Sequence, residues 1–159
     1  MCGLTGFLVF PTRTEGDLKE MALRMAKVIA HRGPDDFGAW ADAQAGIALG
    51  HRRLAIVDLS PNGHQPMQSD SGRYMLVFNG EIYNHFLLRQ MLGTAGHAPS
   101  WRGHSDTETL LAGFDAWGIQ GTVEKSIGMF AFAVWDRQAS TLTLGRDRLG
   151  EKPLYYGWQ

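Results

Sequence analysis

The sequence predicts an α+β fold in which two mostly antiparallel sheets lie face to face between helices, a four-layer αββα sandwich. Two segments, 74–78 and 129–135, are continuously apolar, which is typical of strands buried on both faces. Such strands do not suit a sheet with one face in water, so each belongs in an inner layer, between a second sheet and helices. The helices are few and the connections look antiparallel, which argues against a regular βαβ alternation.

Composition narrows the class of protein further. The chain has 159 residues, 44% of them hydrophobic, which suits a single globular domain with a sizeable core. A net charge of −1 offers no reason to expect nucleic acid or a membrane surface as partner. A lone cysteine forms no internal disulfide, and the N-terminus lacks a signal-peptide pattern, so a cytoplasmic location is expected. The histidines lack metal-ligand spacing, so no metal site is predicted.

The first predicted elements are a strand over 4–10 and a helix from about residue 17. Asp17 and Glu20 have the spacing of a capping box at the start of this helix. Apolar residues then recur with helical spacing. The residues predicted to face the core are Leu18, Met21, Met25, Val28 and Ile29.

A strand at 37–41 is followed by an extended run over 46–58 with an irregular alternation. Ile47 and Leu49 share one parity, whereas Leu54 and Ile56 share the other. A β-bulge between them would shift the phase, and bulges often re-aim a side chain beside a site. The shifted stretch 51–53 contains two arginines, which could equally be solvated on an exposed strand face. The pattern does not say which side chain is re-aimed.

The buried segment 74–78 continues directly into Asn79, Gly80 and Glu81. Polar residues at the end of a buried strand are well placed to form a site. The Asn-Gly pair is also the usual sequence of a type I′ hairpin turn, so the residues themselves leave both interpretations open.

The second half of the chain is predicted to contain two helices and three strands. A short helix is expected over 86–92, and Ser105 with Glu108 forms a capping box for a helix that runs to about Trp117, with Gly118 as its terminator. Asp106 lies in the first turn of this helix. Its carboxylate could either interact favourably with the helix dipole or bind a cation. Strands follow over 129–135, 141–144 and 153–156, the last cut short.

Cys2 is the most distinctive chemical feature, because it directly follows the initiator methionine. A small side chain at position 2 generally permits removal of that methionine, which would leave a thiol and a free α-amine on one residue. With ordinary pKa values of about 8.5 and about 8, the amine could serve as the base for the thiol. A cysteine at position 2 could also be incidental, so this hypothesis needs support from the rest of the chain.

Eight stretches of the sequence, in order, provide that support. They are Met-Cys-Gly-Leu-Thr-Gly (1–6), His-Arg-Gly-Pro-Asp-Asp (31–36), Gly-His-Arg-Arg-Leu-Ala-Ile-Val-Asp (50–58), Gly-His-Gln-Pro-Met (63–67), Asn-Gly-Glu-Ile-Tyr-Asn (79–84), Ser-Asp-Thr-Glu (105–108), Gly-Met-Phe-Ala-Phe-Ala (128–133) and Gly-Arg-Asp-Arg-Leu-Gly-Glu-Lys-Pro-Leu-Tyr-Tyr (145–156). Together they resemble the glutaminase domain of glutamine-hydrolysing asparagine synthetase. This domain is a class II glutamine amidotransferase of the N-terminal-nucleophile hydrolase superfamily. The stretch 31–35 favours the asparagine synthetase branch over the phosphoribosyl and glucosamine-phosphate branches.

The resemblance implies a role for each matching residue. Cys2 would attack the side-chain amide of glutamine, with Asn79 and Gly80 as the oxyanion hole. Arg53 would bind the substrate carboxylate, and Glu81 and Asp106 its ammonium. The remaining residues implied to line the substrate site are Leu54, Ile56 and Val57, together with Gly80.

The resemblance also implies what surrounds this domain. Residues 1–159 would be a class II amidotransferase domain truncated at its C-terminus, with the synthetase domain absent. L-glutamine and a C-terminal synthetase domain or subunit would be its partners, and the oligomeric state stays open, a homodimer included. The glutaminase chemistry needs no cofactor or metal, whereas ATP and Mg²⁺ would belong to the synthetase part.

Several functional hypotheses remain open from the sequence. The ammonia could serve asparagine synthesis from aspartate, or amidation of a sugar or peptide carboxylate in a related biosynthetic enzyme. The residues also leave open a non-catalytic glutamine-binding domain and a purely structural β-rich module. A retained Met1 would block the α-amine, so the site would then be inactive.

Overall fold

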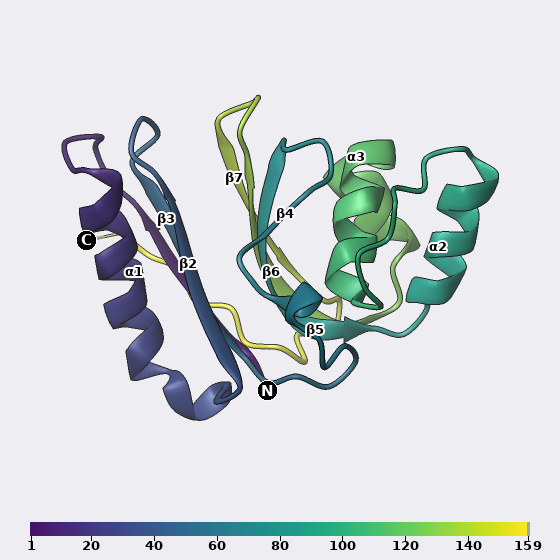
Figure 1. The fold of residues 1–159 in the computed structure, drawn as a ribbon, viewed down its shortest axis with the longest axis horizontal. Helices are drawn as coiled ribbons and strands as arrows, with labels where there is room; N and C mark the ends of the chain where they lie inside the picture. The colour runs from purple at the N-terminus through teal and green to yellow at the C-terminus, as the bar shows by residue number, and fades with distance from the viewer. Residues whose placement is uncertain (159) are drawn as a thin grey trace.

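The computed structural model describes residues 1–158 and contains the four predicted layers (Figure 1). The chain runs through β1 (Gly3–Leu8), α1 (Glu15–Val28), β2 (Asp36–Asp42), β3 (Ile47–Arg53), β4 (Met67–Gln68), β5 (Tyr74–Ile82), α2 (His85–Thr94), α3 (Asp106–Lys125), β6 (Gly128–Asp136) and β7 (Thr141–Arg146). Two 3₁₀ turns, η1 (Ala30–Arg32) and η2 (Pro61–Gly63), lie in the connections.

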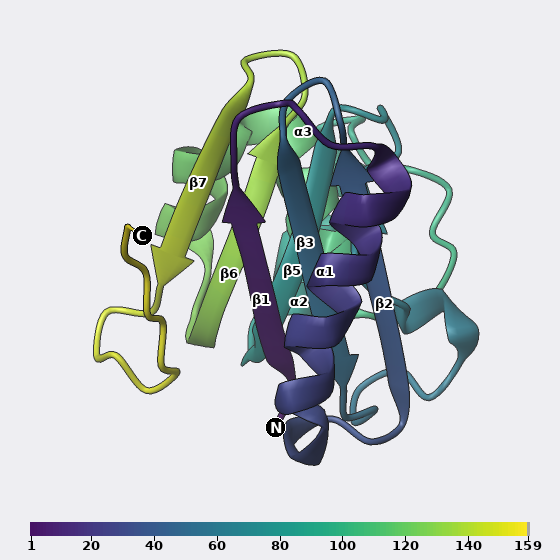
Figure 2. The same cartoon turned by 90° about the vertical axis from the view of Figure 1, so that its left-hand side faces the viewer.

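The strands form two sheets, and their described pairings are all antiparallel. Sheet A has the order β1-β3-β2, and sheet B has the order β4-β5-β6-β7. Helix α1 covers the outer face of sheet A, as Figure 2 shows, whereas α2 and α3 cover the outer face of sheet B. This is the αββα arrangement of the N-terminal-nucleophile hydrolase fold.

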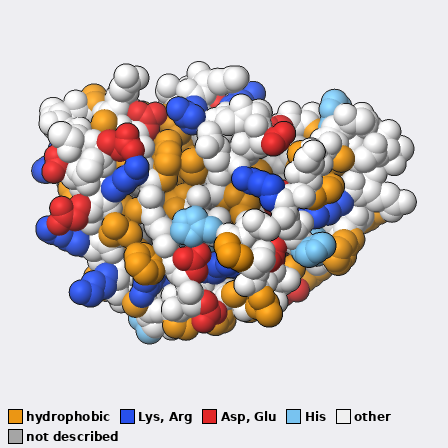
Figure 3. All heavy atoms as spheres, viewed as in Figure 1, with side chains coloured by type: hydrophobic (Ala, Val, Ile, Leu, Met, Phe, Trp, Pro, Cys, Tyr) orange, Lys and Arg blue, Asp and Glu red, His pale blue; other side chains and the backbone are white. Residues whose placement is uncertain are grey.

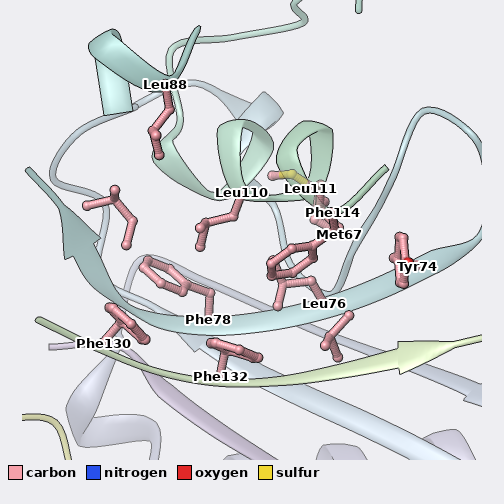
Figure 4. Packing of buried hydrophobic residues seen from close by; sticks show 12 residues of the cluster. Met67, Tyr74, Leu76, Phe78, Leu88, Leu110, Leu111, Phe114, Phe130 and Phe132 are labelled. Carbon is pink, nitrogen blue, oxygen red and sulfur yellow. The ribbon is translucent and has the colours of Figure 1, made fainter. Parts of the chain in front are cut away.

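Strand β5 is buried on both faces, as the continuous apolar run predicts. Met75 and Val77 join the cluster between the sheets, which includes Ile47 and Leu49 of sheet A. The alternate residues Leu76 and Phe78 point the other way, into a cluster that α2 and α3 cover (Figure 4). Because side chains alternate along a strand, the odd-numbered residues of β5 face sheet A throughout.

Helix α1 differs from the prediction in its cap and in its buried face. Thr14 is the N-cap and forms a capping box with Asp17, so the box lies three residues earlier than predicted. The buried residues are Leu18, Ala22 and Ala26, whereas Val28 is 78% exposed. The cause is a close approach to sheet A, since a Cβ at Gly50 would lie 2.9 Å from the carbonyl oxygen of Ala22. Large side chains do not fit such an approach, and small ones do.

Strand β3 contains no bulge, so this prediction was wrong. Its residues pair one for one with β1 from Ile47 to Arg52 and with β2 from Ile47 to Arg53. Arg53 therefore lies on the same face as Ile47 and Leu49, toward sheet B. The change of phase arises because the strand ends at Arg53, and Leu54 begins a loop.

The remaining elements follow the prediction with three differences, of which the first is that no strand was predicted at β4. Gly118 has a φ of +73° and kinks α3, which continues as a second helical segment to Lys125. The segment 153–156 is not a strand, and Tyr155 and Tyr156 are 92% and 83% exposed. Within residues 1–158, helices of the length and apolar character that a membrane span requires are lacking.

The surface carries mixed charge. On the face that Figure 3 shows, basic and acidic side chains are interspersed, in keeping with the net charge of −1.

Candidate active site

The residues predicted to form a site come together at one end of the sandwich. Cys2 precedes β1, Arg53 is the last residue of β3, and Asp106 is the first residue of α3. Because β1 and β3 are antiparallel, the start of the first strand lies beside the end of the second. A pocket of about 120 Å³ opens there. The predicted residues that line it are Cys2, Arg53, Leu54, Ile56, Val57, Asn79, Gly80, Glu81 and Asp106.

A second hollow, of about 300 Å³, lies beside α3 and contains none of these residues. Its Ser71 hydroxyl donates a hydrogen bond to Asp115 at 2.6 Å. The thiol and the convergent charges place the candidate active site in the smaller pocket.

Cys2 is held by backbone contacts on two sides. The N–H of Leu54 donates a hydrogen bond to Cys2 Sγ at 3.3 Å, and Arg32 Nε donates to the Cys2 carbonyl oxygen at 3.1 Å. The Cys2 Sγ also lies 3.6 Å from the Leu54 carbonyl oxygen, so the sulfur rests against the backbone of that residue. Met1 also lines the pocket, and Lys152 Nζ lies 3.5 Å from its Sδ. Removal of Met1 would therefore both free the α-amine and enlarge the pocket.

Arg53 is buried and clamped by the loop that follows it. Its guanidinium donates to the carbonyl oxygens of Asp58 and Ser60, the latter at 2.9 Å. Gly63 lies directly against this group, because a Cβ there would come within 2.0 Å of Arg53 Nη2. The loop therefore holds the cation in one orientation at the wall of the pocket.

Asp58 organises the loop 54–60. Its Oδ1 accepts from Ser60, and its Oδ2 accepts from the N–H of His104 at 2.9 Å. Burial acts to raise the pKa of Asp58, but the hydrogen bonds from Ser60 and His104 outweigh it, and the pKa is lowered. Asp58 thus connects the Arg53 loop to the segment that leads into α3.

Asn79 and Gly80 lie within β5, so the pair is not a hairpin turn. Asn79 and Glu81 have odd numbers and so face sheet A, on the side where Cys2 and Arg53 lie. Gly80 allows the close pairing with β6, since a Cβ there would lie 2.3 Å from the Met129 carbonyl oxygen. The strand thus brings an amide side chain and a carboxylate to the pocket.

The Gly80 N–H points away from β6, to the edge of β5 that the short strand β4 leaves unpaired beyond Leu76, here called the free edge of β5. Phe78 and Ile82, which have the same parity, donate their N–H groups at that edge to the side chains of Gln65 and Asp106, at 2.7 and 2.9 Å. On the other side, Phe130 opposite Gly80 directs both its backbone groups toward Asp147. Among the described residues the Gly80 N–H has no acceptor, so a donor is available in the pocket.

Asp106 is 5% exposed, and burial raises its pKa to about 6 although the Ile82 N–H bond opposes the shift. The nearby Glu81 carboxylate adds to the rise. Two acidic groups near one another in a pocket favour a bound cation, which would restore the ionised form of Asp106.

Several lining residues were given no part in catalysis or substrate binding by the sequence interpretation. They are Met1, Asp58, Gly63, Gln65, Phe78, Ser105, Thr107, Met129 and Lys152. Most belong to the matched stretches of sequence, which are the one signal that could have found them. Their contacts join distant segments, so periodicity does not reveal them. Within residues 1–158 there is no cluster of three or more His, Cys, Asp or Glu side chains placed to hold a metal ion.

The fold and the pocket define a class, the N-terminal-nucleophile hydrolases, and in this chain the candidate nucleophile, Cys2, directly precedes β1. A family model described as "Glutamine amidotransferase domain" matches residues 1–159. The chain belongs to this family, which confirms the resemblance in sequence.

Curated relatives agree with this assignment. The chain is 39% identical to a putative glutamine-hydrolysing asparagine synthetase of Mycobacterium tuberculosis (strain ATCC 25618 / H37Rv), over 98% of this chain and 25% of that protein. It is 40% identical to asparagine synthetase [glutamine-hydrolyzing] 1 of Bacillus subtilis (strain 168), over 98% and 24%. It is 35% identical to amidase chry2 of Gibberella zeae, over 98% and 24%. The chain thus spans about a quarter of the length of these relatives.

Proposed function

We propose that this chain hydrolyses glutamine to glutamate and ammonia, with Cys2 as the nucleophile. The observation that carries the proposal is one pocket that combines a thiol, a free backbone N–H, a guanidinium and two carboxylates. A free α-amino acid with an amide side chain complements this set. Its carboxylate would pair with Arg53, its ammonium with Asp106 and Glu81, and its amide would lie beside Cys2.

The reaction would proceed in two steps. After removal of Met1, the Cys2 α-amine takes the thiol proton, and the sulfur attacks the side-chain amide carbon of glutamine. The oxygen of the tetrahedral intermediate accepts hydrogen bonds from the Gly80 N–H and the Asn79 side chain. The C–N bond then breaks, the α-ammonium returns its proton, and ammonia leaves. Water attacks the γ-glutamyl thioester, which releases glutamate and regenerates the thiol.

The names of the relatives support a proposal for the reaction in which the ammonia is used. We propose that it is transferred to a synthetase part for ATP-dependent amidation, with aspartate as the acceptor. That part would supply the ATP and Mg²⁺ sites, whereas the proposed glutaminase step uses neither. A second candidate is a biosynthetic amidotransferase that acts on another carboxylate, because one of the relatives is named an amidase and not an asparagine synthetase. Glutamine- and ATP-dependent pyrophosphate release, measured with aspartate and with other carboxylates, would separate the two.

The first test is the intact mass of the protein before and after exposure to a diazo-ketone analogue of glutamine. We expect a mass without Met1 and a single adduct on Cys2. The matched variant Cys2→Ala should give no adduct and no glutaminase activity, yet bind glutamine with nearly unchanged affinity. Hydrolysis of glutamine by Cys2→Ala would contradict the mechanism. Binding of glutamine by a processed wild-type protein that neither reacts nor turns over would favour a non-catalytic binding domain instead.

A further inference from the structure

The free edge of β5 is lined by side chains that hold its backbone groups one by one. Gln65 Oε1 accepts from the Phe78 N–H at 2.7 Å, and His51 Nε2 lies 3.0 Å from the Phe78 carbonyl oxygen. Farther along, Asp106 accepts from the Ile82 N–H at 2.9 Å. The Gly80 N–H lies between these bonds and is the donor that the proposed reaction uses.

Gln65 and His51 approach this edge from different parts of the molecule. Gln65 is 5% exposed, and its Nε2 donates to Thr107 Oγ1 at 3.3 Å, which connects β5 to the first turn of α3. His51 is fully buried on the face of β3 that looks toward sheet B, so its bond joins the two sheets. A carbonyl oxygen only accepts, so Nε2 carries the hydrogen.

The two side chains therefore hold two consecutive peptide groups, immediately before the peptide that carries the Gly80 N–H. We propose that Gln65 and His51 are positioning residues that fix the direction of this N–H toward the reacting carbonyl oxygen. The inference rests on the proposed glutaminase function and deepens it, because neither residue needs to contact the reacting atoms. Misplacement of such a donor by about 1 Å is enough to cost on the order of 100-fold in rate.

His51 offers a matched pair of variants. In His51→Gln the terminal amide reaches the position of Nε2 and is able to donate to Phe78. In His51→Asn the amide is one methylene shorter and reaches the position of Nδ1, which has no partner among the described residues. Both variants carry a polar amide whose size does not exceed that of the histidine side chain. They therefore differ mainly in whether they form the hydrogen bond to the Phe78 carbonyl oxygen.

The experiment compares ground-state and intermediate-state binding in these variants and in Gln65→Leu. The probe is the aldehyde analogue of glutamine, whose carbonyl carbon forms a C–S bond with Cys2 while its oxygen becomes the tetrahedral oxygen at Gly80. We expect kcat to fall by about 10–100-fold in His51→Asn and Gln65→Leu. The inhibition constant of the aldehyde should rise by a similar factor. Affinity for glutamine, measured in a Cys2→Ala background, should change by less than about threefold.

Two controls make the result specific. His51→Gln should retain kcat within about threefold of wild type. Ser69→Ala removes an acceptor of the Tyr74 N–H on the same edge of the same strand, far from the pocket, and should leave kcat unchanged. Thermal unfolding of all variants would show that activity was compared between folded proteins. If Gln65→Leu does not fold, the two His51 variants still decide the question.

Each outcome has a defined meaning. Equal kcat in His51→Asn and His51→Gln, or a loss of glutamine affinity as large as the loss of aldehyde affinity, would overturn the positioning roles. The proposed function would still stand in that case, because the wild type hydrolyses glutamine. A processed wild type that neither hydrolyses glutamine nor binds the aldehyde would overturn the proposed function, and this inference with it.

Discussion

Gly63 illustrates how a single residue without a reactive side chain shapes the candidate site. It lies against the Arg53 guanidinium, which the carbonyl oxygens of Asp58 and Ser60 hold from the other side. The cation therefore has little freedom to move. Its orientation depends on the absence of a side chain at a position in the loop well beyond the end of β3.

We predict that Gly63→Ala raises the KM for glutamine by about tenfold, with a much smaller change in kcat. The added methyl group would displace the guanidinium and weaken a charge-assisted hydrogen bond to the substrate carboxylate. Steady-state glutaminase kinetics measure the effect. Gly93→Ala is a matched control, because a Cβ there meets no neighbouring atom within 4 Å. An unchanged KM in Gly63→Ala would argue against Arg53 as the carboxylate ligand.

Asp106 gives a second prediction at the residue scale, because burial raises its pKa to about 6. Above this pH the carboxylate is ionised and able to pair with the substrate ammonium. Below it the protonated acid loses that attraction, so kcat/KM should fall as the pH decreases through about 6. The pH profile of kcat/KM measures the pKa in the free enzyme. In Asp106→Asn we expect a lower kcat/KM throughout, and persistence of the limb near pH 6 would exclude Asp106 as its source.

At the scale of elements, one arginine of α2 holds the loop that leads into α3. Arg89 Nε donates to Thr109 Oγ1 at 2.8 Å, and its terminal nitrogens donate to the carbonyl oxygens of Gly103 and Ser105, each at 3.0 Å. The Trp101 ring stacks on the same guanidinium, 4.0 Å from ring centroid to Cζ. Helix α2 thus determines where α3 begins, and with it the place of Asp106.

Arg89→Met should lower the free energy of unfolding by about 2–3 kcal/mol, because it leaves carbonyl oxygens without donors. It should also raise the KM for glutamine, since the first turn of α3 would shift. Urea unfolding and steady-state kinetics test the two effects together. Arg24→Met is a suitable comparison, because its exposed i,i+4 ion pair with Glu20 contributes little. Equal stability of the two variants would contradict this role of Arg89.

At the scale of the whole molecule, two buried groups near the interface of the layers have opposite effects on stability. Burial lowers the pKa of His51 from 6.5 to about 4, so the unfolded chain binds its proton first and stability is lost as the pH falls from 6.5 to 4. The raised pKa of Asp106 has the opposite sign, and stability is gained as the pH falls from about 6 toward 3.8. Each effect amounts to about 3 kcal/mol, so they largely cancel.

We predict that Asp106→Asn exposes this hidden dependence. Its free energy of unfolding should fall more steeply than that of wild type between pH 6 and pH 4, by about 3 kcal/mol in total. His51→Gln should do the reverse, with a free energy of unfolding that rises as the pH falls from 6 to 4. Chemical denaturation at several pH values in this range provides the measurement. Parallel curves for wild type and Asp106→Asn would contradict the raised pKa.

Much of the architecture follows from local patterns. The runs at 74–78 and 129–135 predicted strands buried on both faces, and these became β5 and β6 in the inner layer. The face of α1 was mispredicted because hydrophobic periodicity favours large side chains such as Met25, whereas close packing on sheet A selects Ala22 and Ala26. The phase change after Leu49 indicated an irregularity correctly but did not distinguish a bulge from the end of a strand.

The sequence by itself determined the layered architecture and the family. Strands buried on both faces are recognised as continuous apolar runs, and the family is recognised from motifs that occur in a fixed order. Through the resemblance it also named about half of the residues that line the pocket, Cys2 and Arg53 among them. The tertiary structure alone decided which backbone groups of β5 are held and which one is free. The Phe78 bonds to Gln65 and His51 span 13 and 27 positions, and His51 belongs to the other sheet. Hydrogen bonds at that separation depend on packing, for which local periodicity carries no information.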